Sequence, residues 1–550
     1  MIDIQVRYAN ETISCPYGTV AQTALSRLGI AEDALVALRV DNEICPLNTL
    51  LAASSTLEPV LAGSPEGAMI YRRSLAFLLA MAARKLFPGQ RLYVGHSLGN
   101  SYYYTFDRGA PPDGQAISAL QGEMEALVRQ DIPITFKYLG YEQAIRLFSE
   151  NLQTDTVQLL EQRGGSRIKV NECGGCLDMY VEPLVPRTGM LSLFQLMPYQ
   201  EGLLLRFPAV GSTVIEPFND QPQLFGIYRE YKKWGRIVGV RVVADLNSMV
   251  ANRTIRDHIR IAEIHQERKI AEIAEQIHDQ RDRVKLILIA GPSSSGKTTC
   301  AKRLSLELMV MGIRPVNISL DSYFVGTEQT PRDENGQPDY ECLEALDIAF
   351  LNDQLQALYR GEEISLPVYD FKTGSRSNVG GKKIRLDRRM VLIAEGIHAL
   401  NDALTPGIAR DTKFKMYVSA LTQLNLDDHN RVPTSDNRIL RRLVRDYQFR
   451  AKDAARTIKM WSSVQAGERK HIFPFQNTAD AVLNSALDYE LSVLKYYADP
   501  ILRAVKPAQA EHAEASRLLS FLENFAPIPP QYVPGTSILR EFIGDSEFKY

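Results

Sequence analysis

The chain has 550 residues, 45% of them hydrophobic and 23% charged, and this ordinary globular composition excludes a largely disordered or collagen-like protein. At roughly 100–200 residues per domain, the length predicts about three or four domains. The 63 Lys and Arg against 65 Asp and Glu leave a formal net charge of −2. Global charge therefore predicts no nucleic-acid or membrane partner, and any site for a polyanion must be local.

Cysteine content and hydropathy indicate the compartment. Six cysteines are too few for a disulfide scaffold and suit reducing conditions. The first ten residues have neither the basic stretch nor the apolar run of a signal peptide. The longest apolar candidate, residues 74–83, is far shorter than the roughly 20 residues that a membrane span needs. We therefore expect a soluble cytoplasmic protein without a membrane partner.

Hydrophobic periodicity and turn residues divide the chain into five parts. The first 62 residues alternate like strands around one helical stretch, and a long amphipathic helix is expected over about 251–280. From residue 284, apolar strand-like runs alternate with helical patterns, which is typical of a parallel sheet with crossover helices. The predicted parts are a small α+β domain (1–62), a mixed α+β domain (63–225), a connector (226–282), an α/β domain (283–505) and a tail (506–550).

The strongest motif is the segment Gly291-Pro-Ser-Ser-Ser-Gly296-Lys297-Thr298, which follows an apolar strand and precedes a predicted helix. It fits the G-x-x-x-x-G-K-[ST] pattern of a phosphate-binding loop. Its backbone N–H groups and the helix N-terminus favour phosphate oxygens, Lys297 suits the β- and γ-phosphates, and the Thr298 hydroxyl suits Mg²⁺. The residues expected to bind ATP here are Gly291, Ser293, Ser294, Ser295, Gly296, Lys297, Thr298 and Thr299.

Two acids end the neighbouring predicted strands. Asp321 follows the run RPVNISL, and Glu395 ends the run MVLIAE. Ligands of a parallel sheet sit at the carboxyl ends of its strands, so both side chains are expected to face the nucleotide. Asp321 can accept a proton from an attacking hydroxyl or hold the metal, and Glu395 is expected to be a second Mg²⁺ ligand.

A later predicted helix is rich in arginine. Arg438, Arg441, Arg442 and Arg445 recur at three- and four-residue spacing and share one broad face. One interpretation is a solvated basic face paired with acids. Because a phosphate-binding loop lies in the same domain, we favour the other interpretation, in which the arginines form a lid over the triphosphate.

These segments resemble a known family. GPSSSGKTT, SLDSYF, DYECLEALD, PVYDFKTGSR, VLIAEGIHAL and RRLVRDYQFRAKD occur in this order. Together they resemble the uridine/cytidine kinase group of the phosphoribulokinase-like P-loop kinases over about 284–500. The resemblance implies an ATP- and Mg²⁺-dependent kinase in which Asp321 takes the proton of a ribose 5′-hydroxyl.

The resemblance also implies roles for individual residues. It places Mg²⁺ at Thr298, Asp321 and Glu395. It implies catalytic roles for Asp321, Lys297, Arg442, Arg445 and Arg450, with Lys452 as a further basic residue at the ATP. The implied acceptor-site residues are Asp321, Phe324, Tyr340, Glu341, Tyr369, Arg376 and Arg442.

Two positions depart from the family. Gly374 stands where the family has a His that contacts the pyrimidine base, so a ring and its hydrogen bond are missing from the base pocket. Glu341 stands where family enzymes commonly have Asp. The sequence therefore does not identify the nucleobase, and the acceptor could be a larger purine nucleoside or a different hydroxyl compound.

The first half resembles another family. Residues 1–62 resemble the ubiquitin-like TGS domain of threonyl-tRNA synthetases, and residues 68–210 resemble the editing domain that follows it there. The segments RRSLAFLL and DMYVEPLVPRTG carry the second match. The four metal-ligand positions of that domain hold Arg73, Phe77, Tyr180 and Leu184, which are not usual zinc ligands. We expect no zinc and no editing by the usual route.

Three smaller motifs are best interpreted as structural features without a functional role. Cys173-Gly-Gly-Cys176 is a lone C-x-x-C, interpreted as two reduced cysteines around a turn. Residues 102–104 are three tyrosines, and residues 228–236 are basic and aromatic, so both could stack on RNA. We favour a strand with one buried and one exposed aromatic face, and a solvated loop.

The sequence thus predicts a multidomain α/β and α+β protein whose second half is a nucleoside kinase that uses ATP and Mg²⁺. Two alternatives stay open. One is an RNA- or tRNA-binding regulatory protein that uses the kinase fold as a nucleotide switch. The other is a kinase for a non-nucleoside hydroxyl metabolite. A homo-oligomer is compatible with either.

Overall fold

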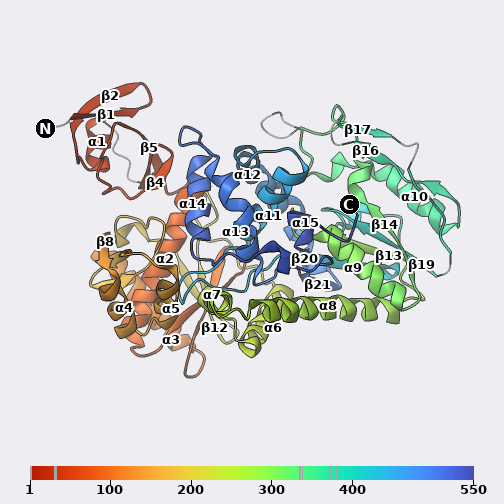
Figure 1. Cartoon of the computed structure of the whole chain (residues 1–550), viewed down its shortest axis with the longest axis horizontal. Coiled ribbons are helices and arrows are strands. Elements are labelled where there is room, and N and C mark those ends of the chain that lie inside the picture. Colours follow the sequence, from red (N-terminus) through yellow and green to blue (C-terminus); the bar gives the residue numbers. More distant parts are fainter. Residues whose placement is uncertain are drawn as a thin grey trace. The chain divides into compact units, whose positions relative to one another are not determined.

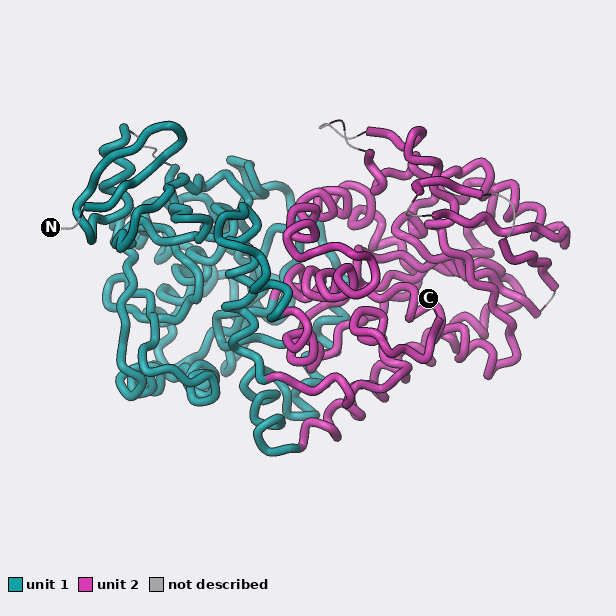
Figure 2. Tube along the Cα trace, turned by 45° about the horizontal axis from the view of Figure 1, so that its top comes forward, with its two compact units in different colours: residues 1–253, 423–432, 499–526 teal, residues 254–422, 433–498, 527–550 magenta. Residues whose placement is uncertain are grey.

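The computed structural model describes residues 3–29, 34–332, 336, 338–370, 373–377, 381–387 and 389–549. Phe371 and Lys372 of the quoted PVYDFKTGSR segment lie outside these ranges. The chain forms two compact units (Figure 2): unit 1 comprises residues 1–253, 423–432 and 499–526, and unit 2 comprises residues 254–422, 433–498 and 527–550. No helix within the described ranges is long and apolar enough to cross a membrane.

Unit 1 begins with a five-stranded mixed sheet and one helix. The strand order is β2-β1-β5-β3-β4, with β1 and β5 parallel and the other neighbours antiparallel. This is the ubiquitin-like arrangement predicted for residues 1–62, and its apolar positions alternate into a small core of its own. The elements are β1 (Asp3–Tyr8), β2 (Glu11–Pro16), α1 (Ala21–Arg27), β3 (Leu35–Val40), β4 (Glu43–Cys45) and β5 (Ser55–Leu61).

The rest of unit 1 is an α+β assembly around α2 (Pro65–Leu86). Ser64 caps this helix by accepting from the Gly67 N–H, and Pro65 occupies its first turn. Two sheets accompany α2, in the orders β10-β9-β8 and β11-β12-β7-β6. The further elements are β6 (Leu92–Ser97), β7 (Ser101–Phe106), α3 (Gly114–Gln130), β8 (Ile134–Gly140), α4 (Tyr141–Glu150), α5 (Thr154–Arg163), β9 (Arg167–Cys173), β10 (Cys176–Asp178), β11 (Gln195–Tyr199), β12 (Gly202–Arg206), α6 (Pro222–Val238), α7 (Val243–Ala251) and α14 (His512–Leu522).

Unit 2 is built on a parallel sheet in the order β14-β19-β13-β20-β21. Helices cover the sheet (Figure 1), and every residue of the central β13 is buried, which explains its uninterrupted apolar sequence. The elements are α8 (Ile255–Asp279), β13 (Leu286–Ala290), α9 (Lys297–Val310), β14 (Arg314–Ser319), α10 (Ile348–Tyr359), β15 (Ile364–Ser365), β16 (Val368–Asp370), β17 (Ser375–Ser377), β18 (Lys383–Ile384), β19 (Met390–Glu395), β20 (Lys413–Ser419), α11 (Thr434–Phe449), α12 (Ala454–His471), β21 (Ala481–Asn484) and α15 (Arg540–Ile543).

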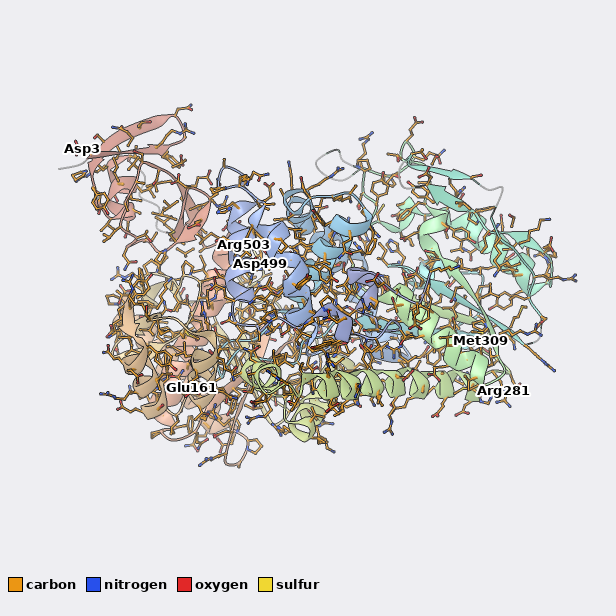
Figure 3. The ribbon with its side chains drawn as sticks, viewed as in Figure 1. Asp3, Glu161, Arg281, Met309, Asp499 and Arg503 are labelled. Atoms are coloured by element: carbon orange, nitrogen blue, oxygen red, sulfur yellow. The ribbon has the colours of Figure 1, made fainter. Side chains whose placement is uncertain are left out.

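The long amphipathic helix predicted as a connector is α8, and it belongs to unit 2. It packs along α9, and Figure 3 labels Arg281, just past the end of α8, and Met309, near the end of α9. The segment predicted as a tail is divided, with residues 506–526 in unit 1 and residues 527–550 in unit 2. Helix α13 (Glu490–Arg503) runs from unit 2 into unit 1, and its last turn carries the ion pair between Asp499 and Arg503, at 2.6 Å.

The structure shows where the three smaller motifs lie. Cys173 and Cys176 are free and flank the two-glycine turn of the β9–β10 hairpin, which confirms the structural interpretation. The strand expectation for residues 102–104 is half wrong, because Tyr103 and Tyr104 are only 3% and 1% exposed and both faces of β7 are covered. Residues 228–236 form part of α6 and not a loop, because Pro222 begins a helix that continues through them.

Candidate active site

The phosphate-binding loop joins β13 to α9 as its sequence predicts. Ser294 and Gly296 have positive φ, +59° and +84°, which curl the loop tightly enough to bring successive N–H groups to one side. At Gly291 a Cβ would overlap the carbonyl oxygen of Val418 on the neighbouring strand, so only glycine fits there. Lys297, the first residue of α9, folds back over the loop, and its Nζ donates to the carbonyls of Gly291 and Pro292 at 2.9 and 3.2 Å.

Asp321 and Glu395 lie at adjacent strand ends. β14 and β19 are parallel with Ser319 opposite Glu395, and Asp321 stands in the short 3₁₀ turn that follows β14. The Thr298 hydroxyl donates to Glu395 Oε1 at 3.4 Å. The structure thus brings together the three residues expected to hold Mg²⁺, beside Lys297.

Electrostatics couple the two acids. Burial, and then the neighbouring Asp321, raise the pKa of Glu395 to about 7, although Lys297 opposes the shift. Burial also raises the pKa of Asp321, against the attraction of Lys297 and Arg450. Because burial raises both pKa values in spite of these cations, the pair favours either a proton or a metal cation between its carboxyl groups.

Arg438 and Arg441 on α11 do not belong to a lid, contrary to the interpretation of the whole arginine face. Arg438 pairs with Glu468 of α12 and donates to the Ser293 carbonyl at 2.9 Å. Arg441 is fully buried, pairs with Glu490 at 2.5 Å and donates to the carbonyl of Ser485 at 2.8 Å. Both side chains therefore support the phosphate-binding loop through hydrogen bonds to its carbonyl groups.

The other basic residues gather at Asp446. Arg442 donates to the Ser293 hydroxyl at 2.7 Å, and Arg445 and Arg450 approach the Asp446 carboxylate at 2.8 and 3.7 Å. Asp446 is buried, and although burial alone would raise its pKa, these arginines hold it below the usual value. The side chain of Arg450 is half exposed. Lys452 lies near Arg442 and Arg450, whose charges add to burial in lowering its pKa.

Glu341 lies close to these groups. Burial, and then Glu468, raise its pKa to about 7, while Arg442 and Lys297 oppose the rise. Gly467 of α12 packs against Glu341, and a Cβ at position 467 would lie 2.6 Å from the Cβ of Glu341. Only a residue without a side chain fits at this position of the facing helix.

Three aromatic side chains lie next to each other beside Asp321. The Phe324 ring centroid is 6.0 Å from that of Tyr340 and 5.6 Å from that of Tyr369. The Tyr340 hydroxyl donates to Thr327 Oγ1 at 3.2 Å. Thr327 in turn donates through its N–H to the Gly374 carbonyl at 3.0 Å, so the segment that carries Gly374 is fixed against this cluster.

Arg376, expected in the acceptor site, is engaged elsewhere. Its guanidinium pairs with Asp347 at 2.7 Å, and that carboxylate also caps α10 by accepting from the Phe350 N–H. The structure therefore gives Arg376 a structural role at the start of α10, next to the aromatic cluster.

Sequence reasoning missed three acids of this region. Glu468 accepts from the Ser293 N–H at 2.8 Å, Glu490 neutralises Arg441, and Glu541 accepts from Thr299. Each is far along the chain from its partner, and no local pattern marks it. The run of arginines on α11 was a signal for acids that pair with Arg438 and Arg441, but it gave none for Glu541.

Packed side chains occupy the positions in unit 1 that the resemblance to synthetases assigns to metal ligands. Arg73 pairs with Glu182, and Phe77 packs edge-on against the buried Tyr180 with 5.7 Å between ring centroids. Among the residues that the structure describes, no group of three or more His, Cys, Asp or Glu could hold a metal ion.

Residues 423–432, which follow β20 along the chain, complete that part of unit 1. His429 Nδ1 lies 2.6 Å from Asp178 Oδ2, and Asn430 donates to the carbonyl of Met179, next to Tyr180, at 2.9 Å. Asp428 pairs with Arg91 at 2.5 Å. This ten-residue segment thus packs beside Tyr180, which the sequence did not predict.

Comparison with known proteins finds similarity to two kinds of protein. The Phosphoribulokinase / Uridine kinase family matches residues 286–492. The threonine–tRNA ligase of Desulfovibrio desulfuricans is 34% identical over 182 residues, which are 32% of this chain and 28% of that protein. The ligase of Nitratidesulfovibrio vulgaris is 29% identical over 164 residues, 30% of this chain and 26% of that protein. The chain therefore spans little more than a quarter of the length of these ligases.

Solved structures with partial similarity include a possible uridine kinase from Bacillus stearothermophilus, 21% identical, covering 36% of this chain and 89% of that one, with a TM-score of 0.24. Another is D-glycerate 3-kinase from Cryptococcus neoformans, 16% identical, covering 46% and 87%, with a TM-score of 0.23. Residues 286–492 thus form a P-loop kinase domain of the phosphoribulokinase/uridine kinase family, in a chain whose N-terminal region is similar to threonine–tRNA ligases.

Proposed function

We propose that unit 2 transfers the γ-phosphate of ATP to the 5′-hydroxyl of a nucleoside. The observation that carries the proposal is the convergence of Lys297, Asp321 and Glu395 at the loop end of one parallel sheet. Phosphoryl transfer needs positioning, positive charge and a group that accepts the hydroxyl proton. This arrangement offers all three.

The donor oxygens suit Mg²⁺. Thr298, Asp321 and Glu395 supply one hydroxyl and two carboxylates, and Mg²⁺ takes few protein oxygens and keeps several waters. When bound there, Mg²⁺ would neutralise charge on the β- and γ-phosphates. Lys297 is the protein's own cation at the loop, and Arg442, Arg445 and Arg450 are placed to add charge on the other side.

Asp321 is the proposed base. It follows the strand next to β19 and lies near both Lys297 and the aromatic cluster, so its carboxylate can hold the acceptor hydroxyl and take its proton. Glu341 is proposed to accept from the acceptor's other hydroxyls. Phe324, Tyr340 and Tyr369 offer apolar rings on which a base can pack.

The proposal is tested by screening ADP release from ATP and Mg²⁺ with each common ribonucleoside, and with sugars, sugar phosphates and hydroxy acids. The expected result is acceptor-dependent ADP release with a nucleoside and none above background with Asp321→Asn. Release only with a non-nucleoside hydroxyl compound would keep the kinase and replace the acceptor. If ATP binds but no acceptor in the screen gives ADP release, the kinase proposal is rejected.

The two N-terminal domains are proposed to be a TGS-like domain and an editing-like scaffold without metal chemistry. The support is the ubiquitin-like strand order of residues 3–61 and the side chains that fill the former ligand positions. Tyr103 and Tyr104 are buried and therefore do not offer their rings to RNA bases.

Activity is expected to depend jointly on pH and Mg²⁺. With a pKa of about 7, Glu395 is protonated in acid, and a metal ion can bind its carboxylate only after the proton leaves. The rate at low Mg²⁺ should therefore fall as pH drops through about 7, and raising Mg²⁺ should move that fall to lower pH. Initial rates over a grid of pH and Mg²⁺ measure this.

Glu341 supplies the control because its pKa is also about 7. The Glu341→Gln variant should keep the Mg²⁺-dependent shift of the acid limb, and Glu395→Gln should lose it. An acid limb in the parent enzyme that stays at one pH at every Mg²⁺ concentration contradicts the assignment of Glu395.

Restoring a histidine at position 374 is expected to damage the site and not to create a pyrimidine contact. Gly374 has φ +66°, and a Cβ there would overlap Thr327 Oγ1. The strain costs about 1–3 kcal/mol, so Gly374→His should lower the melting temperature without raising kcat/KM for uridine over adenosine. Gly374→Ala is the matched control and should show most of the same loss. A selective gain with uridine in the His variant would show that the pocket can accept the ring.

A further inference from the structure

Glu541 of α15 places a carboxylate on the first turn of α9. Its Oε2 accepts from the Thr299 N–H at 3.1 Å and from the Thr299 hydroxyl at 2.6 Å. Thr299 is the third residue of α9, in the first turn, where a phosphate-binding loop offers its N–H groups to phosphate. The Glu541 carboxylate thus occupies a place at which the N–H groups of the loop and of the helix start would bind phosphate.

The backbone around Glu541 also follows the loop closely. Ile538 is fully buried against Gly296, where a Cβ would lie 2.5 Å from Ile538 Cγ2. Further along, the Lys302 ammonium donates to the main-chain oxygen of Lys549. The contact of Glu541 with Thr299 is therefore one of several along the same face of α9.

The segment is held ready by its own interactions. Arg540 donates to the carbonyls of Val533, Pro530 and Gly544 at 2.7, 3.1 and 3.3 Å. Phe542 is fully buried, with its ring centroid 4.9 Å from the Arg441 guanidinium. Because these contacts fix the neighbours on both sides, Glu541 reaches Thr299 with little further loss of conformational freedom.

We propose that residues 537–547 act as an internal competitor of ATP, with the Glu541 carboxylate holding a phosphate-binding position until nucleotide displaces it. The inference rests on the proposed nucleotide site but not on the identity of the acceptor. One carboxylate carries a single charge, whereas a triphosphate carries several and also reaches Lys297. ATP can therefore displace Glu541 from Thr299. The apparent affinity for ATP is reduced by the fraction of molecules in which Glu541 is seated.

Titration calorimetry of the full-length protein with ATP and Mg²⁺ tests the proposal, without any acceptor present. The Glu541→Ala variant should bind ATP about tenfold more tightly than the parent protein, and the isosteric Glu541→Gln should fall between them because it keeps an acceptor but loses the charge. Glu547→Ala is the matched control. It removes an acid from the same segment, at a position that faces Gly535, and should leave the affinity unchanged.

The outcomes separate the inference from the proposed function. Unchanged or weaker ATP binding in both Glu541 variants, with a normal melting temperature, overturns the competitor and makes Glu541 a helix cap or a part of the ATP site. If neither the parent nor any variant binds ATP, the nucleotide site itself fails. If ATP binds more tightly but no nucleoside is phosphorylated, the competitor stands and the proposed acceptor fails.

Hydrogen exchange gives a second readout that does not depend on substitution. Saturating ATP should raise exchange of the amides in residues 537–547 of the parent protein, because displaced Glu541 releases the segment. Protection of the same amides by ATP would contradict displacement.

Discussion

Replacing Asp321 by Asn is expected to lower kcat by about 10²–10⁴-fold while ATP still binds within a few fold of the parent affinity. The substitution keeps the size of the side chain and removes the carboxylate that takes the acceptor proton. Lys297 and the loop amides, which hold the phosphates, are untouched. Single-turnover rates with saturating acceptor, together with calorimetry for ATP, separate the two effects.

Asp353→Asn is the matched control for Asp321→Asn. Asp353 is exposed on α10 in the same unit, so the same change of charge and size there should leave both constants unaltered. If Asp321→Asn kept a rate close to that of the parent enzyme, Asp321 would not be the base. If it lost ATP binding as well, its main role would be at the metal.

Replacing Arg441 by Met is expected to destabilise unit 2 by about 3–5 kcal/mol, because it leaves the Glu490 carboxylate buried without its partner. Both side chains are at most 1% exposed, and Arg441 also braces Ser485 and the Ser294 carbonyl beneath the phosphate-binding loop. The double variant Arg441→Met/Glu490→Leu should recover much of the loss, since it removes both charges together.

A single-tryptophan reporter makes this measurement specific to unit 2. The chain has two tryptophans, Trp234 in α6 and Trp461 in α12, and only the second lies in unit 2. In a Trp234→Phe background, urea unfolding followed by Trp461 fluorescence should show the Arg441→Met midpoint well below that of the background. Arg450→Met, which removes a half-exposed arginine at the end of the same helix, should move the midpoint little but lower activity. Equal midpoints for both would refute the structural role of Arg441.

The phosphate-binding loop and the parallel sheet could be predicted from local sequence. The five apolar residues of β13, the glycines of the loop and Lys297 act within about a dozen positions, so their geometry follows from nearest-neighbour rules. Asp321 and Glu395 were predictable for a related reason, because parallel strands bring their carboxyl ends to one edge.

Contacts between distant segments were not predictable in this way. Helical spacing places Arg438 and Arg441 on one face with Arg442 and Arg445, but it cannot show that Glu468 and Glu490 arrive from other elements to bury the first two. The excursion 423–432 looks like an ordinary loop in sequence. The role of Gly467 opposite Glu341 likewise depends on which helix faces the loop.

The most direct test of the proposed reaction is ³¹P NMR of the product formed from ATP, Mg²⁺ and the best nucleoside of the screen. The expected result is one phosphate monoester whose phosphorus couples to the 5′-methylene protons, with no product from the 5′-deoxynucleoside or from the Asp321→Asn enzyme. Inorganic phosphate as the only product, or a phosphate ester at another hydroxyl that also forms with the 5′-deoxynucleoside, would contradict transfer to the 5′-hydroxyl through Asp321.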